Sequence, residues 1–196
     1  MKNKIAAVVL TLAMLVPLTG NAASYRSNNT TSALSATKTY LGVKYGVLTI
    51  EPDTSGSSDV EVDNLGFTFG GHFNDYLAME FEYTQTVSAA DDDYAGTPVT
   101  ISTDTMGLYL VAKTTGTLYG KARVGYGRIE QEFRSLGSDT IYGLSYGLGV
   151  GVEVTDNFTI EGEYTIYPKT EEGDRFGEFV DLLTDMITVN LVWSYN

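Results

Sequence analysis

The sequence contains no cysteine among its 196 residues. This absence excludes disulfide frameworks, thiol chemistry and attachment of a lipid to a cysteine. The chain also holds a single histidine, His72, which is too few for a metal site built from Cys and His. Beyond the N-terminus no apolar run approaches the roughly 18 residues of a membrane-spanning helix, so helical spans are excluded.

Basic residues are scarce as well. Lys and Arg number 12 against 25 Asp and Glu, and the formal net charge is −13. A chain this acidic is a poor partner for nucleic acids. Glycine is frequent, but it falls inside strand-like stretches and not in a loop that leads into a helix, so we predict no phosphate-binding loop.

The N-terminus has the pattern of a secretory signal. Two early lysines precede an apolar run of about 12 residues and then a stretch of small residues. We predict a signal peptide at 1–23, cleaved after Ala22 or Ala23. A retained anchor is the alternative, but the run is shorter than the roughly 20 residues that span a bilayer. The polar, aperiodic residues 24–38 indicate a flexible segment, and 39–196 fit one domain.

The rest of the chain alternates between two chemically different faces. In residues 77–84 the odd positions are Leu, Met, Phe and Tyr, and the even positions are Ala, Glu, Glu and Thr. A period of two residues indicates β-strands. Most of the alternating stretches are near 10 residues, close to the 9–11 of a tilted transmembrane strand. We predict eight strands, at 40–50, 64–73, 77–86, 104–113, 118–127, 141–154, 158–167 and 186–195.

The connections alternate between short and long. Three short turns are predicted at 74–76, 114–117 and 155–157, where Asn, Asp and Gly supply turn chemistry. Four long polar segments are predicted at 51–63, 87–102, 128–140 and 168–185. This layout is typical of outer-membrane barrels. The predicted fold class is all-β, an eight-stranded antiparallel transmembrane β-barrel with short periplasmic turns and four long extracellular loops.

The two faces differ in charge. We assign no Asp, Glu, Lys, Arg or His to the apolar face, as expected where a lipid-facing Lys or Arg costs about 2–4 kcal/mol. The other face holds charges that must pair if they are buried. We predict an interior charge network that plugs the lumen, and a selective conduit is the alternative. The network residues are Lys44, Glu80, Glu82, Lys113, Lys121, Arg123, Glu153, Glu161 and Glu163.

A soluble up-and-down barrel, such as a lipocalin, is the alternative fold. It would place the apolar face inside, and bulky Phe and Tyr would overfill an eight-stranded interior. Glycine favours the membrane barrel, because eleven glycines fall on the charged face and three on the apolar face. Aromatic residues near both strand ends fit the girdles of a membrane barrel: Phe73, Tyr83, Tyr126, Tyr142, Phe158, Tyr164, Trp193 and Tyr195.

Four stretches carry a family resemblance: 40–47 (YLGVKYGV), 66–83 (GFTFGGHFNDYLAMEFEY), 142–154 (YGLSYGLGVGVEV) and 158–167 (FTIEGEYTIY). They resemble the small OmpA/OmpX-like and opacity-protein-like, porin-family outer-membrane barrels. The resemblance covers the whole mature chain and implies location in the outer membrane of a Gram-negative cell. Such barrels usually end on an aromatic residue, whereas here Asn196 follows Tyr195, so the insertion signal departs from the pattern.

The long loops carry most of the remaining acid. These acidic side chains form a solvated surface or bind divalent cations that bridge the loops to lipopolysaccharide. Apolar residues in the last loop pack locally or form an interaction patch for another cell's surface or a host protein: Phe176, Phe179, Leu182 and Leu183.

We predict no catalytic, cofactor or metal residues, because the lone His72 reads as a hydrogen-bonded interior filler. The expected partners are outer-membrane lipids and lipopolysaccharide, and the expected state is a monomer. The predicted function is a structural or surface-interaction (adhesion-like) role through the acidic loops, as for a surface antigen of the cell envelope. A narrow passive pore for small solutes is the alternative.

Overall fold

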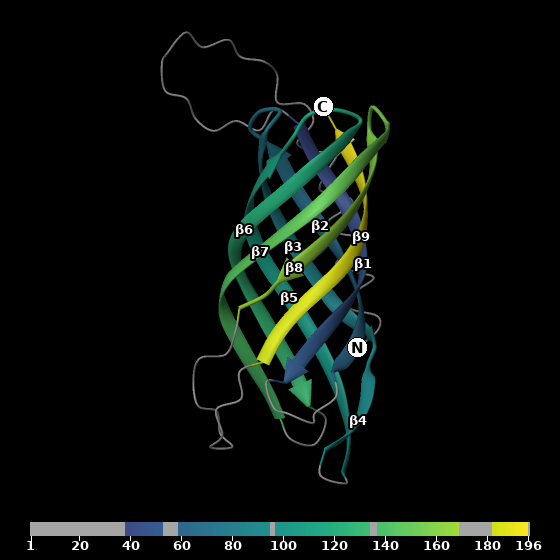
Figure 1. The fold of residues 1–196 in the computed structure, drawn as a ribbon, viewed down its shortest axis with the longest axis vertical. Coiled ribbons are helices and arrows are strands. Elements are labelled where there is room, and N and C mark those ends of the chain that lie inside the picture. The colour runs from purple at the N-terminus through teal and green to yellow at the C-terminus, as the bar shows by residue number, and fades with distance from the viewer. Residues whose placement is uncertain (1–37, 53–58, 95–96, 134–136, 169–181, 196) are drawn as a thin grey trace.

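The computed structural model describes residues 38–52, 59–94, 97–133, 137–168 and 182–195. No helix in this part of the chain is long and apolar enough to cross a membrane. Nine strand segments form one antiparallel sheet that closes into a barrel (Figure 1). They are β1 (Lys38–Pro52), β2 (Val60–His72), β3 (Leu77–Ser88), β4 (Ala90–Tyr94), β5 (Thr97–Lys113), β6 (Leu118–Phe133), β7 (Gly137–Thr155), β8 (Phe158–Ile166) and β9 (Leu182–Tyr195).

The nine segments make eight wall strands. β3 and β4 are separated only by Ala89, and both pair with β5, so together they occupy one position in the wall. The order around the barrel is β3-β2-β1-β9-β8-β7-β6-β5, and the β3–β5 pairing closes the ring. The predicted eight-stranded antiparallel barrel is confirmed.

Three short turns lie at one end of the barrel, the upper end in Figure 1. Asn74 Oδ1 accepts hydrogen bonds from the backbone N–H of Tyr76 at 2.8 Å and of Leu77 at 2.9 Å. Thr155 Oγ1 accepts one from Phe158 N at 3.1 Å. Gly116 has a φ of +124°, which favours glycine. Side-chain capping and one glycine therefore fix the turns where the sequence predicts them.

The strands extend further toward the opposite end than predicted. The predicted loop 128–140 is mostly strand, because β6 continues to Phe133 and β7 begins at Gly137. Likewise β2 begins at Val60, and the predicted loop 87–102 contains all of β4. In the added residues of β2 and β6 the alternation continues, but the outward positions are polar, as at Glu61, Glu130 and Glu132. Polar outward residues above a membrane face water at no cost, and for that reason the sequence pattern resembled a loop.

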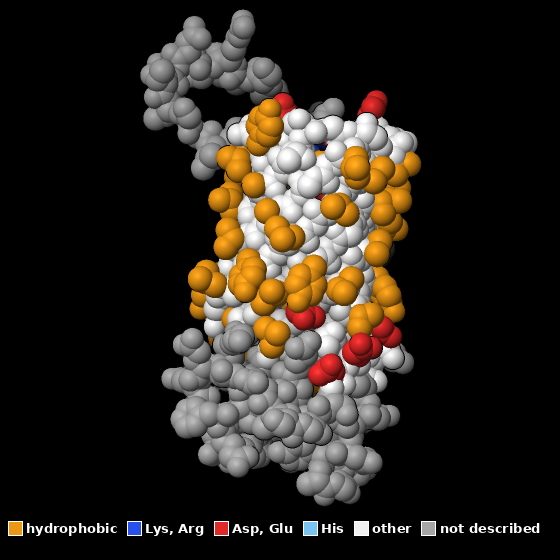
Figure 2. Space-filling model, viewed as in Figure 1, with side chains coloured by type: hydrophobic (Ala, Val, Ile, Leu, Met, Phe, Trp, Pro, Cys, Tyr) orange, Lys and Arg blue, Asp and Glu red, His pale blue; other side chains and the backbone are white. Residues whose placement is uncertain are grey.

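The outward face is an apolar wall. Leu144 is 70% exposed and Leu148 is 67% exposed. Figure 2 shows hydrophobic side chains spread over the visible wall, with acidic side chains toward the loop-side end and at the opposite rim. So many exposed Leu, Val and Ile side chains on one band are unfavourable in water and favourable in lipid.

Outward carboxylates begin at one level of the wall. Asp63 lies nine residues before His72, the last residue of β2, and Asp104 lies nine residues before Lys113, the last residue of β5. The apolar face is therefore not free of charge as predicted, because Asp104 points outward at the very start of its predicted strand. Between this level and the short turns, the outward positions of the described strands carry no charge. Nine residues match the length that crosses the apolar core of a membrane.

Tyrosines of neighbouring strands donate hydrogen bonds to two outward carboxylates, Asp104 and Asp185. Tyr83 OH donates to Asp104 Oδ2 at 3.4 Å, and Tyr164 OH donates to Asp185 Oδ2 at 2.9 Å. In both pairs the aspartate lies two residues beyond the tyrosine's cross-strand partner, toward the loop side. An amphipathic ring bonded to a carboxylate suits the boundary between lipid and water.

Candidate functional site

Seven charged side chains meet in the half of the lumen next to the short turns. The acids come from β3 and β8, which the strand order places opposite each other, and the bases come from β1 and β6, which also face each other. Every residue of the cluster is buried. We call it the charge cross: Lys44, Glu80, Glu82, Lys121, Arg123, Glu161 and Glu163.

Arg123 is the centre of the charge cross. Its Nη1 lies 3.0 Å from Glu80 Oε1 and 2.6 Å from Glu82 Oε2, and its Nη2 lies 2.8 Å from Glu163 Oε1. The guanidinium carbon stacks 4.0 Å from the ring centroid of Tyr109. The planar fork of arginine suits this role because it bonds several carboxylates at once. One side chain thus joins opposite walls of the barrel.

The two lysines complete the connections. Lys121 Nζ lies 2.9 Å from Glu80, 3.1 Å from Glu161 and 3.2 Å from Glu163. Lys44 Nζ lies 2.8 Å from Glu163 and also pairs with Glu82 of β3. A solute that passed this level would have to separate buried ion pairs, which is costly. The charge cross therefore spans the lumen from wall to wall.

The charge cross holds four carboxylates and three cations. Interior tyrosines supply further donors: Tyr40 OH to Glu80 at 3.1 Å, Tyr119 OH to Glu161 at 2.5 Å and Tyr167 OH to Glu82 at 2.9 Å. Hydrogen bonds from neutral donors stabilise carboxylates that outnumber the cations.

These interior tyrosines were not predicted, because the tyrosines near the strand ends were assigned to the aromatic girdles. Their phase was the available signal. Tyr40 lies four residues before Lys44 on the same strand, and therefore on the same face.

Inward glycines make room for the rings of three interior tyrosines, Tyr40, Tyr109 and Tyr119. A Cβ at Gly70 would lie 2.3 Å from the Tyr40 ring, and a Cβ at Gly151 would lie 2.3 Å from the Tyr119 ring. The ring of Tyr109 covers Gly107 in the same way. Rings that lie flat on the wall thus explain three of the inward glycines, whereas at Gly66 and Gly125 a Cβ would meet the backbone oxygen of the neighbouring strand at 2.0 Å.

In the loop-side half of the lumen, the described residues form no buried ion pair. Just beyond the charge cross, Thr84 and Thr105 share a hydrogen bond of 2.8 Å, and Asn64 Nδ2 donates to Thr84 Oγ1 at 3.2 Å. Above them lies a cluster that we call the apolar layer: Leu48, Ile50, Val60, Val62, Ile101, Ile129, Tyr167 and Met186. The described interior therefore holds two layers of buried side chains, one of ion pairs and one of mainly apolar residues.

Two residues of the predicted network lie outside it. Lys113 and Glu153 share the inward phase but stand at the short-turn mouth, where Lys113 is half-buried and Glu153 is exposed. They line a cavity of about 360 Å³, which we call the vestibule, between the turns and the charge cross. Their inward phase is as predicted, but the two residues stand too close to the end of the barrel to reach the other charges.

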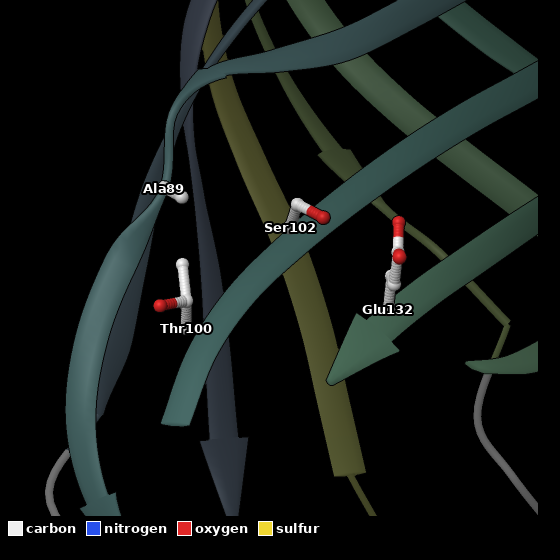
Figure 3. Close-up of a pocket in the computed structure, with 4 residues that line it drawn as sticks. All are labelled: Ala89, Thr100, Ser102 and Glu132. Carbon is white, nitrogen blue, oxygen red and sulfur yellow. The ribbon is translucent and has the colours of Figure 1, made fainter. Parts of the chain in front are cut away.

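His72 also lines the vestibule, with its ring 5.0 Å from the ring of Tyr40. Among the residues that the structure describes, no group of three or more His, Cys, Asp or Glu is placed to hold a metal ion. A second, shallow hollow of about 240 Å³ lies at the loop-side end and is lined by Ala89, Thr100, Ser102 and Glu132 (Figure 3). A carboxylate beside two hydroxyls there has no histidine near it to act as a base.

Half of the predicted loop patch lies outside the described residues. Phe176 and Phe179 belong to that part of the chain. Leu182 and Leu183 are strand residues and not loop residues, because β9 begins at Leu182 and pairs Leu183 with Glu51. The signal peptide at 1–23 and nearly all of the segment at 24–38 also lie outside the described part, although β1 already includes Lys38.

Comparison with known proteins identifies the family. Residues 8–194 match the model of the outer membrane protein beta-barrel domain. The chain belongs to this outer-membrane barrel family. No curated protein matches the chain.

Solved barrels share the fold at low sequence identity. Neisserial surface protein A is 15% identical, with 79% of this chain and 96% of that chain covered and a TM-score of 0.58. OprG from Pseudomonas aeruginosa is 12% identical, with 80% and 96% covered and a TM-score of 0.55. The attachment invasion locus protein Ail of Yersinia pestis is 16% identical, with 80% and 98% covered and a TM-score of 0.51.

Family and structure together fix the setting of this barrel. It is an outer-membrane barrel with its apolar band in lipid, and its short turns face the periplasm, as in other barrels of this kind. The vestibule therefore opens toward the periplasm, and the apolar layer lies toward the cell surface.

Proposed function

We propose that the protein is a closed outer-membrane barrel that acts through its surface-exposed end, in an adhesion-like or structural role. The doubly closed lumen carries this proposal. Arg123 and Lys121 tie opposite walls through buried ion pairs, and the apolar layer, which includes Ile129, adds a second barrier. A barrel filled in this way has little use as a conduit, and its outer end is the part left to make contacts.

The surface-exposed end is built to project. β5, β6 and β7 have 17, 16 and 19 residues, well beyond the roughly 9–11 that cross a membrane. The extra length raises a curved sheet above the level of Asp104. Its outward side chains include Glu130 and Glu132, with Arg128 paired to Glu130. A rigid, acidic projection suits contact with a cationic surface or with lipopolysaccharide through divalent cations. Ail, a solved barrel of the same fold, is named the attachment invasion locus protein.

A narrow passive pore is the second candidate, and it requires the charge cross to open. Planar bilayers that contain the purified protein separate the two proposals. We expect no steady conductance from the native protein at neutral pH. A reproducible conductance level, or swelling of liposomes in small sugars, would favour the pore.

The surface role has its own test. Bacteria that express the protein are compared with bacteria that express Glu130→Gln with Glu132→Gln, for adherence to cultured cells with and without calcium. We expect the double variant to adhere less. Equal adherence of both strains, and of a strain without the protein, would contradict an adhesive role.

We also propose export by the signal peptide at 1–23, a flexible lead-in at 24–38 and a monomeric state without catalytic activity. Intact mass measurement of protein extracted from outer membranes tests the cleavage. The expected mature chain begins at Ala23 or Ser24, and a full-length mass would favour the retained anchor.

A further inference from the structure

The vestibule carries charges that the rest of the barrel does not use. Lys113 and Lys121 are direct cross-strand partners and both face inward, an arrangement in which like charges repel. Lys121 is neutralised by three carboxylates of the charge cross. Lys113 forms no salt bridge within the described residues. Its ammonium group lies 5.0 Å from the ring centroid of Tyr119, and the carboxylates that attract it are Glu153 and, next, Glu161. A surplus cation thus faces the cavity.

A surplus anion faces the same cavity from the opposite side of β6. Glu153 belongs to β7, has the inward phase and lines the vestibule, yet it pairs with no cation of the described residues. Its backbone N–H donates to Thr117 O in the turn between β5 and β6, at 2.8 Å, which holds β7 close to Lys113. β5 and β7 flank β6, so their backbones stand about 10 Å apart. No salt bridge joins the charged ends of Lys113 and Glu153, so a small molecule with two charges can bond to both.

The vestibule between these two charges is partly apolar. Val111 and Val192 line it, and the Tyr119 ring, fixed over Gly151, forms part of its wall. The floor is the closed charge cross, with Lys121 and Glu161 already paired to each other. Lys38, Asp75 and Asp156 also line the mouth, where Lys38 Nζ donates to the backbone oxygen of Asp156 at 3.1 Å. The cavity thus offers groups of both charges and a small hydrophobic wall.

We propose that the vestibule binds a small zwitterion from the periplasm, with a carboxylate on Lys113 and an ammonium group on Glu153. An α-amino acid has this chemistry, and the wall at Val111 and Val192 accommodates a short aliphatic side chain. A simple anion would leave Glu153 unmatched, and a simple cation would leave Lys113 unmatched. The site is independent of the surface role, because it lies at the other end of the barrel.

The test uses isotope-labelled full-length protein in lipid nanodiscs and follows backbone amide shifts near the vestibule. Glycine, acetate and methylammonium are titrated separately. We expect saturable shifts with glycine at Lys113, Tyr119 and Glu153, and binding about tenfold weaker for acetate and methylammonium, since each lacks one ion pair. Acetate that binds as tightly as glycine, or glycine that produces no saturable shift, would overturn the proposal.

Two variants localise the site. Lys113→Met and Glu153→Gln each remove one charge outside the charge cross, so the folded barrel is expected to remain, as checked by its heat-dependent gel mobility. Each is expected to weaken glycine binding about tenfold. Glu132→Gln, at the loop-side end, is the matched control and should bind like the native protein. The exchanged pair Lys113→Glu with Glu153→Lys should restore binding, and undiminished binding in both single variants would contradict the site.

Discussion

The half of the lumen next to the periplasm is crossed by ion pairs, whereas the half next to the cell surface holds an apolar layer beyond a band of hydrogen-bonded Thr and Asn. Both halves share one wall and one lipid-facing surface. In the periplasmic half, Arg123 and Lys121 hold opposite strands by directional bonds of defined length. In the other half, Ile129 and Met186 exclude water by packing alone. The two fillings therefore differ in what the loss of one side chain leaves behind.

An ion that loses its partner stays buried and charged, whereas a lost methyl group leaves only a cavity. Damage in the charge cross spreads to every carboxylate that shared the missing cation. Damage in the apolar layer stays local. This difference predicts an order of effects across substitutions of similar size.

The largest effect is expected from Arg123→Met. The change leaves Glu80, Glu82 and Glu163 without their shared partner, and removal of one member of a buried ionic group costs about 3–5 kcal/mol. Urea unfolding in lipid vesicles, followed by the fluorescence of the single tryptophan, Trp193, measures the change. Arg123→Lys keeps the charge and should lose less. A loss below about 1 kcal/mol for Arg123→Met would remove the contrast between the two halves.

The next effect is expected from Ile129→Ala in the apolar layer. Ile129 is fully buried, and such truncations cost about 2–4 kcal/mol through lost transfer energy and a residual cavity. The same unfolding measurement applies, with Ile129→Val as the milder control at about 1 kcal/mol.

Combination of the two variants tests whether the fillings are independent. Ile129 lies six residues from Arg123 along β6, about 20 Å away, so their effects should add. If the double variant loses much more or much less unfolding free energy than the sum of the two single losses, the two layers act as one unit. Conductance in planar bilayers should appear only when both layers are weakened, because either one alone closes the lumen.

The sequence predicts which side of the wall a residue faces better than it predicts the height of that residue along the barrel. Alternation alone identified the inward phase of Lys44, Glu82 and Arg123, because a strand has only two faces. It did not separate them from Lys113 and Glu153, which share that phase but stand in the vestibule. Height depends on strand tilt and stagger, which a period-two pattern does not encode.

The strand ends near the cell surface were harder to predict for a related reason. Glu61 and Glu132 point outward above the membrane, where a strand tolerates acid. Residues 60–62 still show a strand pattern, because Val60 and Val62 face inward and Glu61 between them faces outward. The short turns were predictable because residues such as Asn74 bond to their own backbone.

A smaller effect is expected from glycine substitutions that contrast the inside of the wall with its outside. A Cβ on Gly125, which faces the lumen, would lie 2.0 Å from the backbone oxygen of Leu108, so Gly125→Ala should cost about 1–3 kcal/mol. Gly120, on the outward face of the same strand, has no atom within 4 Å of such a Cβ. Gly120→Ala should be neutral or stabilising by up to about 1 kcal/mol. Equal losses in both variants, measured by urea unfolding, would mean that strand propensity and not lumen space selects these glycines.

The smallest effect is expected at the outer wall and has a matched partner inside. Tyr164 and Tyr167 each donate one hydrogen bond of 2.9 Å to a carboxylate, to Asp185 at the membrane boundary and to Glu82 in the lumen. Tyr164→Phe should lose about 0.5–1 kcal/mol, because water can replace the hydroxyl at the boundary. Tyr167→Phe should lose about 1.5–3 kcal/mol, since the Glu82 carboxylate is buried and cannot find another donor. The difference between the two variants, about 1 kcal/mol in urea unfolding, measures how much drier the lumen is than the boundary. Identical losses would indicate that water reaches Glu82, and the charge cross would then be a hydrated gate and not a seal.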